Sequence, residues 1–399
     1  RPSSPCGTKF SLPDPLMRRV VLYVDSLKIG GAERVTLTFA RWLRQNGWDP
    51  IVLTRQSVEL DFYPIPAGVE RAVEPRDPRW LRLLGRWGFP WRVLRLRRWL
   101  REQRVSLAIG MTTKPSVKLL LAARPLGLPC VVSERNFPPL KPMALPWGVL
   151  RRFSYRWASL HIVQTRATGD WLNQHLGAEP QLVLPNPVQW PLPRFEPQVD
   201  PQGWLDQEGV AAGAPVLLAA GTKSHQKGFD LLVRAFAELL QKESQAQLVI
   251  LGLTQEVYRG KDQQKALRRL LRQHPLAQSQ LHFPGRVGNM RDWYQRATLF
   301  VLPSRYEGFP NVLLEAMAEG CCCVAADCPH GPADLLRHDT DGVLMPRQAR
   351  ADIWAETMAQ LLRDPARRQR LQAAATAVRE RFSDSTLARQ LIQSLERLG

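Results

Sequence analysis

The sequence predicts an α/β protein with two domains, each built on a doubly wound parallel sheet, that face each other across a cleft. Short apolar runs alternate with amphipathic segments along the chain, as expected when helices cover both faces of a parallel sheet. A proline-rich segment interrupts this alternation near the middle of the chain, and 399 residues are enough for two hydrophobic cores.

The first half of the chain opens with a strand at 20–24, a glycine-rich turn and a helix over 32–45, which Gly47 ends. Met17 directly precedes the segment RRVVLYVD, which holds this strand, so residues 1–16 are predicted to be an extension of the folded chain. Further short apolar strands, each before a helical segment, are predicted at 107–111, 130–133 and 161–164.

The segment PNPVQWPLPRFEPQVDPQG, from Pro185, holds six prolines in 19 residues, which excludes a regular helix or strand and predicts an interdomain linker. The predicted domains are 1–188 and 189–375. The last helix begins at about Ala366, and 376–399 is expected to pack back on the first domain. The alternation restarts after the linker with strands in APVLLAAGT, QLVILG, LHFPG, LFVLPS and CCCVAAD.

Basic residues are concentrated in the first half of the chain. The net charge is +19, and residues 1–190 hold 29 Lys and Arg against 13 Asp and Glu, whereas residues 191–399 hold 26 against 23. This asymmetry indicates a polyanionic partner or an anionic membrane surface for the first half. No uncharged apolar run has the roughly 18 to 20 residues of a membrane span, and the N-terminus shows no apolar signal core.

Four cysteines cluster in the second half of the chain, at Cys321, Cys322, Cys323 and Cys328. Their spacing matches no structural zinc site. These side chains are instead predicted to be buried in a strand, and free thiols indicate a reducing, cytoplasmic compartment. The Asp339-Thr340-Asp341 sequence is predicted to be a surface turn and not a metal site. No metal or other cofactor is therefore predicted.

The loop GTKSHQKGFD, at the carboxyl end of a predicted strand, carries Lys223 and Lys227 just before a helix that begins at about Phe229. An ammonium group beside a helix N-terminus suits a diphosphate. Alternatively, both lysines are solvated loop residues.

A second junction, SRYEGFPNVLLEA, follows another strand of the same domain. Gly308 permits close approach of a ligand to the backbone, and Pro310 is predicted to be the first residue of a helix. Glu315 lies about one and a half turns into that helix, where its carboxylate can accept hydrogen bonds from a ribose. Glu307 then faces the group attached to the far phosphate. Alternatively, Glu315 and Glu319 form one solvated stripe.

Taken in order, these motifs resemble the retaining glycosyltransferases of family 4, which have the GT-B fold. The resemblance covers residues 18–395 and implies transfer of a sugar from a nucleotide-diphosphate donor, with retention at the anomeric carbon and without a metal. It rests on GGAERV, SERN, LPNPV, GTKSHQKGFDLL, FPGRV, the Glu-x7-Glu motif of Glu307 and Glu315, and HGPADLL…DGVLMP.

The resemblance implies that Lys227 neutralises the donor diphosphate, that Glu315 binds the ribose, and that Glu307 lies near the transferred sugar. Thr222 stands where the family usually has an arginine, and Lys223 is the candidate substitute. The other donor-binding candidates are the first-domain loop residues Gly30 and Gly31, the base-lining Arg286 and Val287, and the turn formed by Gly308, Phe309, Pro310 and Asn311.

In many relatives a histidine of the first domain lies near the reacting carbon. Arg135 stands at that position here, directly after Glu134. Both residues are therefore candidates for the catalytic contact of the first domain, in addition to Glu307 and Lys227.

Residues 76–104 contain ten arginines interspersed with tryptophans and leucines. Such basic and aromatic segments favour the interface of an anionic membrane. Alternatively, the apolar residues pack on the first sheet and the arginines are solvated, or the segment binds nucleic acid, although no nucleic-acid-binding fold accompanies it. The predicted apolar face is Val93, Leu94, Leu96 and Leu100, and the acceptor and membrane candidates are Trp91, Arg92, Arg95, Arg97, Arg98, Trp99 and Arg101.

Within the family, this layout resembles bacterial hexosaminyltransferases that act on polyprenyl-diphosphate-linked glycans. The resemblance implies a lipid-linked or glycolipid acceptor, a UDP-sugar donor, and peripheral association with the inner face of the plasma membrane. Two other hypotheses stay open, a nucleotide-sugar 2-epimerase of the same fold and a non-catalytic module that binds anionic lipid or nucleic acid.

Overall fold

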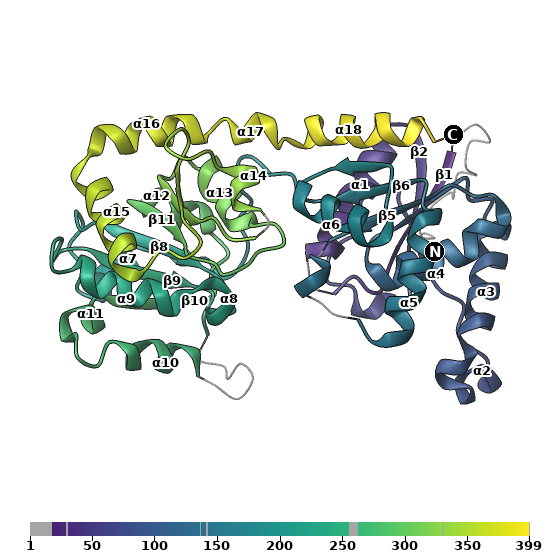
Figure 1. Cartoon of the computed structure of the whole chain (residues 1–399), viewed down its shortest axis with the longest axis horizontal. Helices are drawn as coiled ribbons and strands as arrows, with labels where there is room; N and C mark the ends of the chain where they lie inside the picture. The colour runs from purple at the N-terminus through teal and green to yellow at the C-terminus, as the bar shows by residue number, and fades with distance from the viewer. Residues whose placement is uncertain are drawn as a thin grey trace, which may run out of the picture. The chain divides into compact units, whose positions relative to one another are not determined.

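The computed structural model describes residues 18–28, 31–135, 137–140, 143–254, 262–329 and 331–398 (Figure 1). Apart from those gaps, the chain forms two compact units, of residues 18–163, 169–183 and 388–398 and of residues 164–168 and 184–387. The predicted extension at 1–16 and the candidate residue Gly30 lie outside the described residues.

The first unit is built on a parallel sheet whose described strands pair in the order β3-β2-β1-β4-β5-β6-β7. The centres of the strands are buried, as in β1, where residues 20–23 have no exposed surface. The order reverses between β1 and β4, so the chain leaves these two neighbours toward opposite edges of the sheet. The strands are β1 (Arg18–Val24), β2 (Trp48–Thr54), β3 (Glu70–Val73), β4 (Leu107–Gly110), β5 (Cys130–Glu134), β6 (Leu160–Val163) and β7 (Gln181–Val183).

The buried face of one helix in the first unit differs from the prediction. Val93, Leu96 and Leu100 of α3 are buried in the core, but Leu94, predicted on the same face, is 50% exposed. That prediction was wrong because Leu94 lies about 100° around the helix from Val93. The helices are α1 (Gly31–Gln45), α2 (Arg79–Leu83), the 3-10 turn η2 (Gly85–Gly88), α3 (Phe89–Glu102), α4 (Thr113–Ala123), α5 (Leu145–Ser154) and α6 (Arg166–Leu176), which starts within the second unit.

His161 of β6 is buried, and its ring nitrogens lie 3.3 Å from the carbonyl oxygen of Pro180 and 3.1 Å from that of Tyr155. Burial lowers the pKa of His161 from 6.5 to about 4, although both carbonyls oppose this shift. Between these values the unfolded chain takes up a proton that the folded chain does not. Stability is therefore lost as the pH falls from 6.5 to 4.

We expect the thermal midpoint of the wild-type protein to fall over this pH range, with roughly 3 kcal/mol of the loss due to His161. His161→Gln should flatten the decline, measured by circular dichroism at several pH values. An equally steep decline in the variant would show that other groups cause the acid sensitivity.

The second unit is built on a parallel sheet whose described strands have the order β10-β9-β8-β11-β12-β13. Here the order reverses between β8 and β11. The prediction of two parallel sheets covered by helices is thus confirmed. The strands are β8 (Val216–Ala220), β9 (Gln247–Leu251), β10 (Leu281–Gly285), β11 (Leu299–Leu302), β12 (Cys323–Ala326) and β13 (Val343–Met345).

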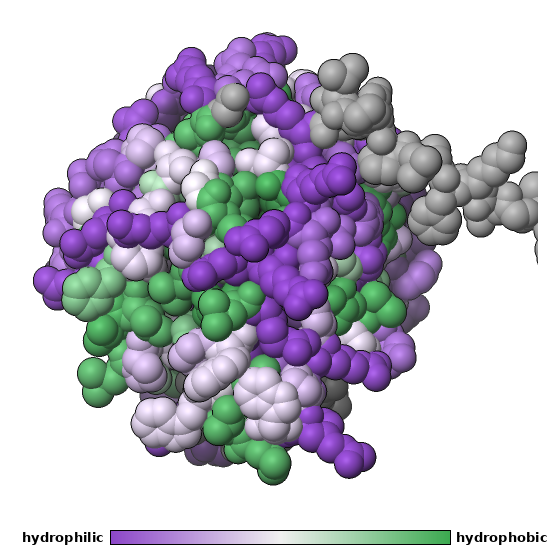
Figure 2. Space-filling model, turned by 90° about the vertical axis from the view of Figure 1, so that its right-hand side faces the viewer, coloured by the Kyte–Doolittle hydropathy of each residue, from purple (hydrophilic) through white to green (hydrophobic). Residues whose placement is uncertain are grey.

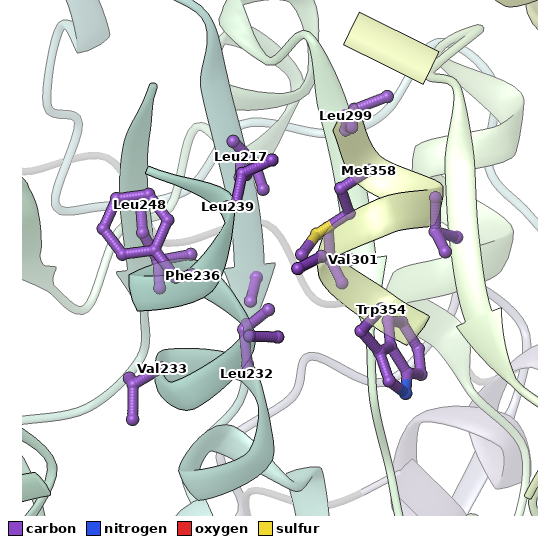
Figure 3. Packing of buried hydrophobic residues seen from close by; sticks show 14 of the residues in the cluster. Leu217, Leu232, Val233, Phe236, Leu239, Leu248, Leu299, Val301, Trp354 and Met358 are labelled. Atoms are coloured by element: carbon purple, nitrogen blue, oxygen red, sulfur yellow. The ribbon is translucent and has the colours of Figure 1, made fainter. Parts of the chain in front are cut away.

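Alternate strand residues of the second unit point into two separate cores, one on each face of its sheet. Figure 3 shows the core beneath α9 and α15, where Leu217 and Leu248 of the sheet lie near Phe236 of α9 and Met358 belongs to α15. The helices are α7 (Pro201–Gln207), α8 (Ser224–Lys227), α9 (Phe229–Leu239), α10 (Gln263–Leu270), α11 (Pro275–Ser279), α12 (Met290–Arg296), α13 (Asn311–Ala318), α14 (Pro332–Leu335) and α15 (Ala351–Arg363).

The C-terminal segment is not one long helix from about Ala366, as predicted. It forms α16 (Pro365–Ala375), α17 (Val378–Arg381) and α18 (Asp384–Glu396). Residues up to Leu387 belong to the second unit, where Arg379 of α17 donates to the carbonyl of Ala318 at 2.7 Å.

The clustered cysteines are buried, as predicted, but of the four only Cys323 belongs to a strand, β12. Burial raises the pKa of Cys322 to about 11 and that of Cys328 to about 12, so both thiols stay protonated at neutral pH. Asp341, predicted in a surface turn, is instead buried. Its carboxylate accepts hydrogen bonds from the backbone N–H of Arg337 at 2.6 Å and from the same residue's Nε at 3.1 Å.

Candidate functional site

The candidate donor site lies where the order of the second sheet reverses. β8 ends at Ala220 and its neighbour β11 ends at Leu302, and the loops that follow them leave the same carboxyl edge of the sheet. In open α/β sheets, ligands bind at this kind of reversal. The two junctions that the sequence singled out, 221–228 and 303–310, are these loops.

At the centre of the site, Lys227 and Glu307 form a buried ion pair, with Nζ and Oε1 2.7 Å apart. Ser304 donates its hydroxyl to the same oxygen at 2.5 Å, and Glu307 is only 4% exposed. The structure therefore joins two candidates that lie 80 residues apart in the chain. The sequence analysis missed Ser304, although its place three residues before Glu307 was readable.

Two glycines shape the lysine loop. The stem of Lys227 lies across Gly221, where an added Cβ would come within 2.7 Å of the lysine Cγ. Gly228 has a φ of +67°, and a Cβ there would meet the carbonyl oxygen of Pro303 at 2.0 Å. These contacts leave no room for a side chain, so they fix where the lysine emerges.

The loop predicted between β8 and α9 contains the one-turn helix α8, with Lys223 preceding it. Gln263 holds this turn by accepting from the N–H of Ser224 at 2.7 Å and by donating to the carbonyl of Thr222 at 3.1 Å. The side chains of Thr222 and Lys223 are exposed. Both candidates are thus at the site's solvent side, held through their backbone.

Arg305 ties the two loops together. It donates to the carbonyl of His225 at 2.7 Å and to both carboxylate oxygens of Asp230 at 2.7 and 2.6 Å. Burial opposes ionisation of Asp230, but the hydrogen bonds and charge of Arg305 lower the pKa of this carboxyl overall.

The second junction begins its helix one residue later than predicted, because Pro310 precedes α13 and Asn311 is the first helical residue. Phe309 is buried in the core, and Gly331, with a φ of +113°, lies so close to Pro310 that an added Cβ would be 2.5 Å from the proline Cδ. The turn with Gly308 is therefore rigidly placed against the sheet edge.

Glu315 of α13 accepts a hydrogen bond from the hydroxyl of Tyr294 at 3.3 Å, and the same hydroxyl lies 3.1 Å from the carbonyl of Val312. Burial, and then the charge of Glu315, raise the pKa of Tyr294, so the phenol stays a donor. The alternative of a solvated stripe with Glu319 is disfavoured, since the Glu319 side chain is also nearly buried and pairs with Arg291 at 3.6 Å.

The remaining donor-binding candidates are more exposed than Glu307. Arg286 is exposed just after β10, and Val287 packs partly against the core. Gly31 is the first residue of α1 in the first unit, with open space where a Cβ would stand.

In the first unit, Glu134 is 2% exposed at the carboxyl end of β5. It accepts hydrogen bonds from the hydroxyls of Tyr155 at 2.9 Å and Thr113 at 3.0 Å, and from Arg151 at 3.3 Å. Burial and the charge of Glu134 raise the pKa of Tyr155, which keeps the phenol protonated. The sequence analysis missed these three partners.

Arg135 is also buried, with its guanidinium 4.8 Å from the ring centroid of Phe39. Burial lowers the pKa of Arg135 to about 9, although the charge of Glu134 opposes this. Its environment is thus apolar and aromatic on one side.

A cavity of about 400 Å³ opens beside Glu134, where the first sheet reverses its order. The indole of Trp147 forms part of its wall, and the Lys114 ammonium lies 5.7 Å from that ring. The described lining residues are Asp25, Thr112, Thr113, Lys114, Glu134, Pro138, Met143, Ala144, Trp147 and Arg151.

The basic segment forms a helical hairpin of α2 and α3 with η2 at its tip (Figure 1). Arg92 holds it together by pairing with Asp77 at 2.6 Å and donating to the carbonyls of Gly85 and Leu81 at 2.6 and 3.1 Å. Arg95 donates to a backbone carbonyl before α2 at 2.9 Å. These two candidates therefore have structural partners.

The other candidates of the hairpin differ in exposure. Arg97 donates to two carbonyls at the end of α4 at 3.3 Å, Arg98 pairs with Glu102 at 2.7 Å, and Arg101 is exposed. Trp91 is exposed and meets another indole edge-on, whereas Trp99 packs partly on the core.

Two family models match the chain, and together they span most of it. The model described as Glycosyltransferase Family 4 matches residues 29–189, and the model described as Glycosyl transferases group 1 matches residues 203–378. The first match lies mainly on the unit that holds the cavity, and the second covers both loops of the candidate donor site.

Similar proteins include LpcC, a lipopolysaccharide core biosynthesis mannosyltransferase of Rhizobium leguminosarum bv. viciae, 28% identical over 72% of this chain and 74% of its own length. The GalNAc-α-(1→4)-GalNAc-α-(1→3)-diNAcBac-PP-undecaprenol α-1,4-N-acetyl-D-galactosaminyltransferase of Campylobacter jejuni is 23% identical over 82% of this chain and 85% of its own. The matched region spans less than two thirds of several other relatives, and 20% of one from Streptomyces coelicolor.

The crystal structure of Anabaena Alr3699/HepE in complex with UDP and glucose superposes with a TM-score of 0.75, at 23% identity over 95% of this chain and all of that one. This likeness confirms the predicted GT-B fold. With both halves of the sequence matched and the fold shared, the chain belongs to the retaining glycosyltransferases of family 4.

Proposed function

We propose that the protein moves a sugar from a UDP-sugar to a lipid-linked or glycolipid acceptor, with retention at the anomeric carbon and without a metal. The observation that carries this proposal is the buried Lys227–Glu307 pair at the reversal of the second sheet. The activities named for two relatives support a sugar donor and a glycan acceptor, and one related structure was solved with UDP and glucose.

In this proposal the second unit binds the donor. The Lys227 ammonium and the positive end of the α13 dipole face the diphosphate, where negative charge grows as the bond to the sugar breaks. Glu315, held by Tyr294, accepts from the ribose hydroxyls. Glu307 keeps the lysine in place and presents its second carboxylate oxygen to the transferred sugar. The lysine and the N-terminal end of α13 supply the positive field that a divalent cation would otherwise provide.

The first unit binds the acceptor in this proposal. Its cavity combines the flat face of Trp147 with charged and hydroxyl groups around Glu134, which suits a sugar ring that needs both an apolar contact and hydrogen bonds. Glu134 and Arg135 are the candidates nearest the acceptor hydroxyl. A leaving phosphate oxygen of the donor takes that hydroxyl's proton.

The hairpin is the proposed membrane contact. Leu83 is 88% exposed and Trp87 74% exposed at its tip, and further exposed apolar residues surround them. Figure 2 shows apolar and hydrophilic side chains lying side by side on this face. Exposed arginines of α2 and η2 supply charge complementary to anionic lipid headgroups. No helix among the described residues has the length and apolarity needed to span a bilayer.

Replacing both tip residues, in Leu83→Ser/Trp87→Ser, should weaken binding to phosphatidylglycerol-containing vesicles by about tenfold or more, because two apolar side chains no longer enter the interface. Co-sedimentation measures this. Phe62→Ser removes an aromatic side chain of similar exposure outside the hairpin and should have little effect. Equal vesicle binding by the double variant would contradict the proposed contact.

A screen of UDP-sugars and GDP-sugars against polyprenyl-linked and glycolipid acceptors, with mass detection of products, tests the reaction. We expect product only when a UDP-sugar and an acceptor are both present. Conversion of the donor without an acceptor would favour the nucleotide-sugar 2-epimerase. Absence of saturable nucleotide-diphosphate binding would favour the non-catalytic module.

A further inference from the structure

Three side-chain amides form a chain of hydrogen bonds that ends at the first residue of α13. Gln164 Nε2 donates to Asn186 Oδ1 at 2.9 Å, and Asn186 Nδ2 donates to Asn311 Oδ1 at 2.8 Å. Gln164 and Asn186 are 8% and 6% exposed, and all three residues belong to the second unit. Asn186 and Asn311, which lie 125 positions apart in the sequence, are thus brought together at the candidate donor site.

The hydrogen bonds between these amides all run in one direction, because each amide has one acceptor oxygen and one donor nitrogen. Asn311 uses its oxygen to accept from Asn186, so its Nδ2 group points away from that partner. Among the described residues, this Nδ2 group donates no hydrogen bond. Asn311 is half-buried in the turn that begins at Gly308, and its own backbone N–H donates to the carbonyl of Phe309 at 3.0 Å.

If these hydrogen bonds only stabilised the fold, they would attach the proline-rich segment to α13 and would need no unpaired N–H donor at their end. A buried relay that turns an amide nitrogen outward at a ligand site instead prepares a hydrogen bond before the ligand arrives. Such preorganisation lowers the cost of ordering the group on binding. The rigid packing of Pro310 against Gly331 next to Asn311 adds to this effect.

We propose that the Asn311 side-chain nitrogen donates to an oxygen of the donor's diphosphate, and that Asn186 and Gln164 are positioning residues that orient it. This inference rests on the proposed function. It assigns the amide of Asn311 a contact separate from the backbone N–H groups of the same turn. It also gives Asn186, which lies in the linker, a role in donor affinity.

A double-mutant cycle read by calorimetry with UDP tests the relay. Asn311→Ala should weaken UDP binding by about tenfold to a hundredfold, the range for a hydrogen bond to a charged group. Asn186→Ala should weaken it several-fold and raise the donor KM more than it lowers kcat. In the Asn311→Ala background, Asn186→Ala should change UDP affinity no further, since it acts only through Asn311.

The matched control is Gln280→Ala. Gln280 is a buried amide that donates to two backbone carbonyls at 2.8 and 3.0 Å, just before β10, an edge strand of the same sheet. The Gln280→Ala variant should have a lower thermal midpoint but an unchanged affinity for UDP. If Asn186→Ala does not fold, Gln164→Ala takes its place in the cycle, with a smaller expected loss that should again vanish beside Asn311→Ala.

Equal losses from Asn186→Ala in both backgrounds would overturn the relay, because a general structural role adds to the Asn311 effect. Unchanged UDP affinity in Asn311→Ala would overturn the proposed contact itself. Failure of the proposed function is a different result, in which the wild-type protein binds neither UDP nor GDP.

Discussion

Lys227→Ala is expected to lower kcat/KM for the nucleotide sugar by a factor of about 10² to 10³, the loss seen when one preorganised donor to a developing negative charge is removed. The lysine also pairs with Glu307, which is almost fully buried. The variant should therefore lose about 3 kcal/mol or more in unfolding free energy, because an unpaired carboxylate stays buried. Steady-state kinetics and urea unfolding measure the two effects.

The double variant Lys227→Ala/Glu307→Ala separates these effects. Removing both charges should restore much of the stability, while activity stays low. The exposed pair of Lys242 and Glu356 offers a matched control in the same unit, and Lys242→Ala should change both quantities little. Full activity of a folded Lys227→Ala variant would mean that the buried pair serves only the fold.

Glu134→Ala is expected to have the second large effect. It removes a carboxylate that three side chains of the first unit share, and it leaves Arg151 buried without its counter-charge. We expect a loss of about 3–5 kcal/mol in unfolding free energy. Glu134→Gln, which keeps an oxygen to accept from Tyr155, should lose less. Urea unfolding measures these differences.

The exposed pair of Arg98 and Glu102 is the comparison for this experiment. Glu102→Ala should change the unfolding free energy little, as for other exposed pairs four residues apart on a helix. If Glu134→Ala is as mild as Glu102→Ala, the buried cluster contributes little, and the acceptor cavity would need another anchor.

Much of the fold could be predicted because it depends on local patterns. Short β-branched runs such as 20–24 became strands, and the helix expected from Phe229 begins at that residue as α9. The breaks between α16, α17 and α18 were missed. The start of α18 has a local signal, since the hydroxyl of Ser383 accepts from the backbone N–H of Thr386 as in an N-cap. The bond from Arg379 of α17 to the carbonyl of Ala318 is tertiary, and no local pattern predicts it.

The residues of the candidate site could be predicted from the sequence, but their arrangement in space could not. Lys227 and Glu307 were each placed at the carboxyl end of a strand, yet their pairing depends on β8 and β11 being neighbours, and strand order is not readable from periodicity. For the same reason the amide chain through Asn186 was missed. The arginines of α3 were treated as one pool because only the structure shows that Arg92 uses its donors inside the hairpin.

That internal use of Arg92 and Arg95 has a kinetic consequence if the hairpin docks on anionic bilayers as proposed. The hairpin reaches the surface already folded, so docking need not wait for folding. Attraction by its exposed arginines is long-range and screened by salt, whereas insertion of Leu83 and Trp87 is not. The association rate should therefore fall steeply with ionic strength while the dissociation rate changes little.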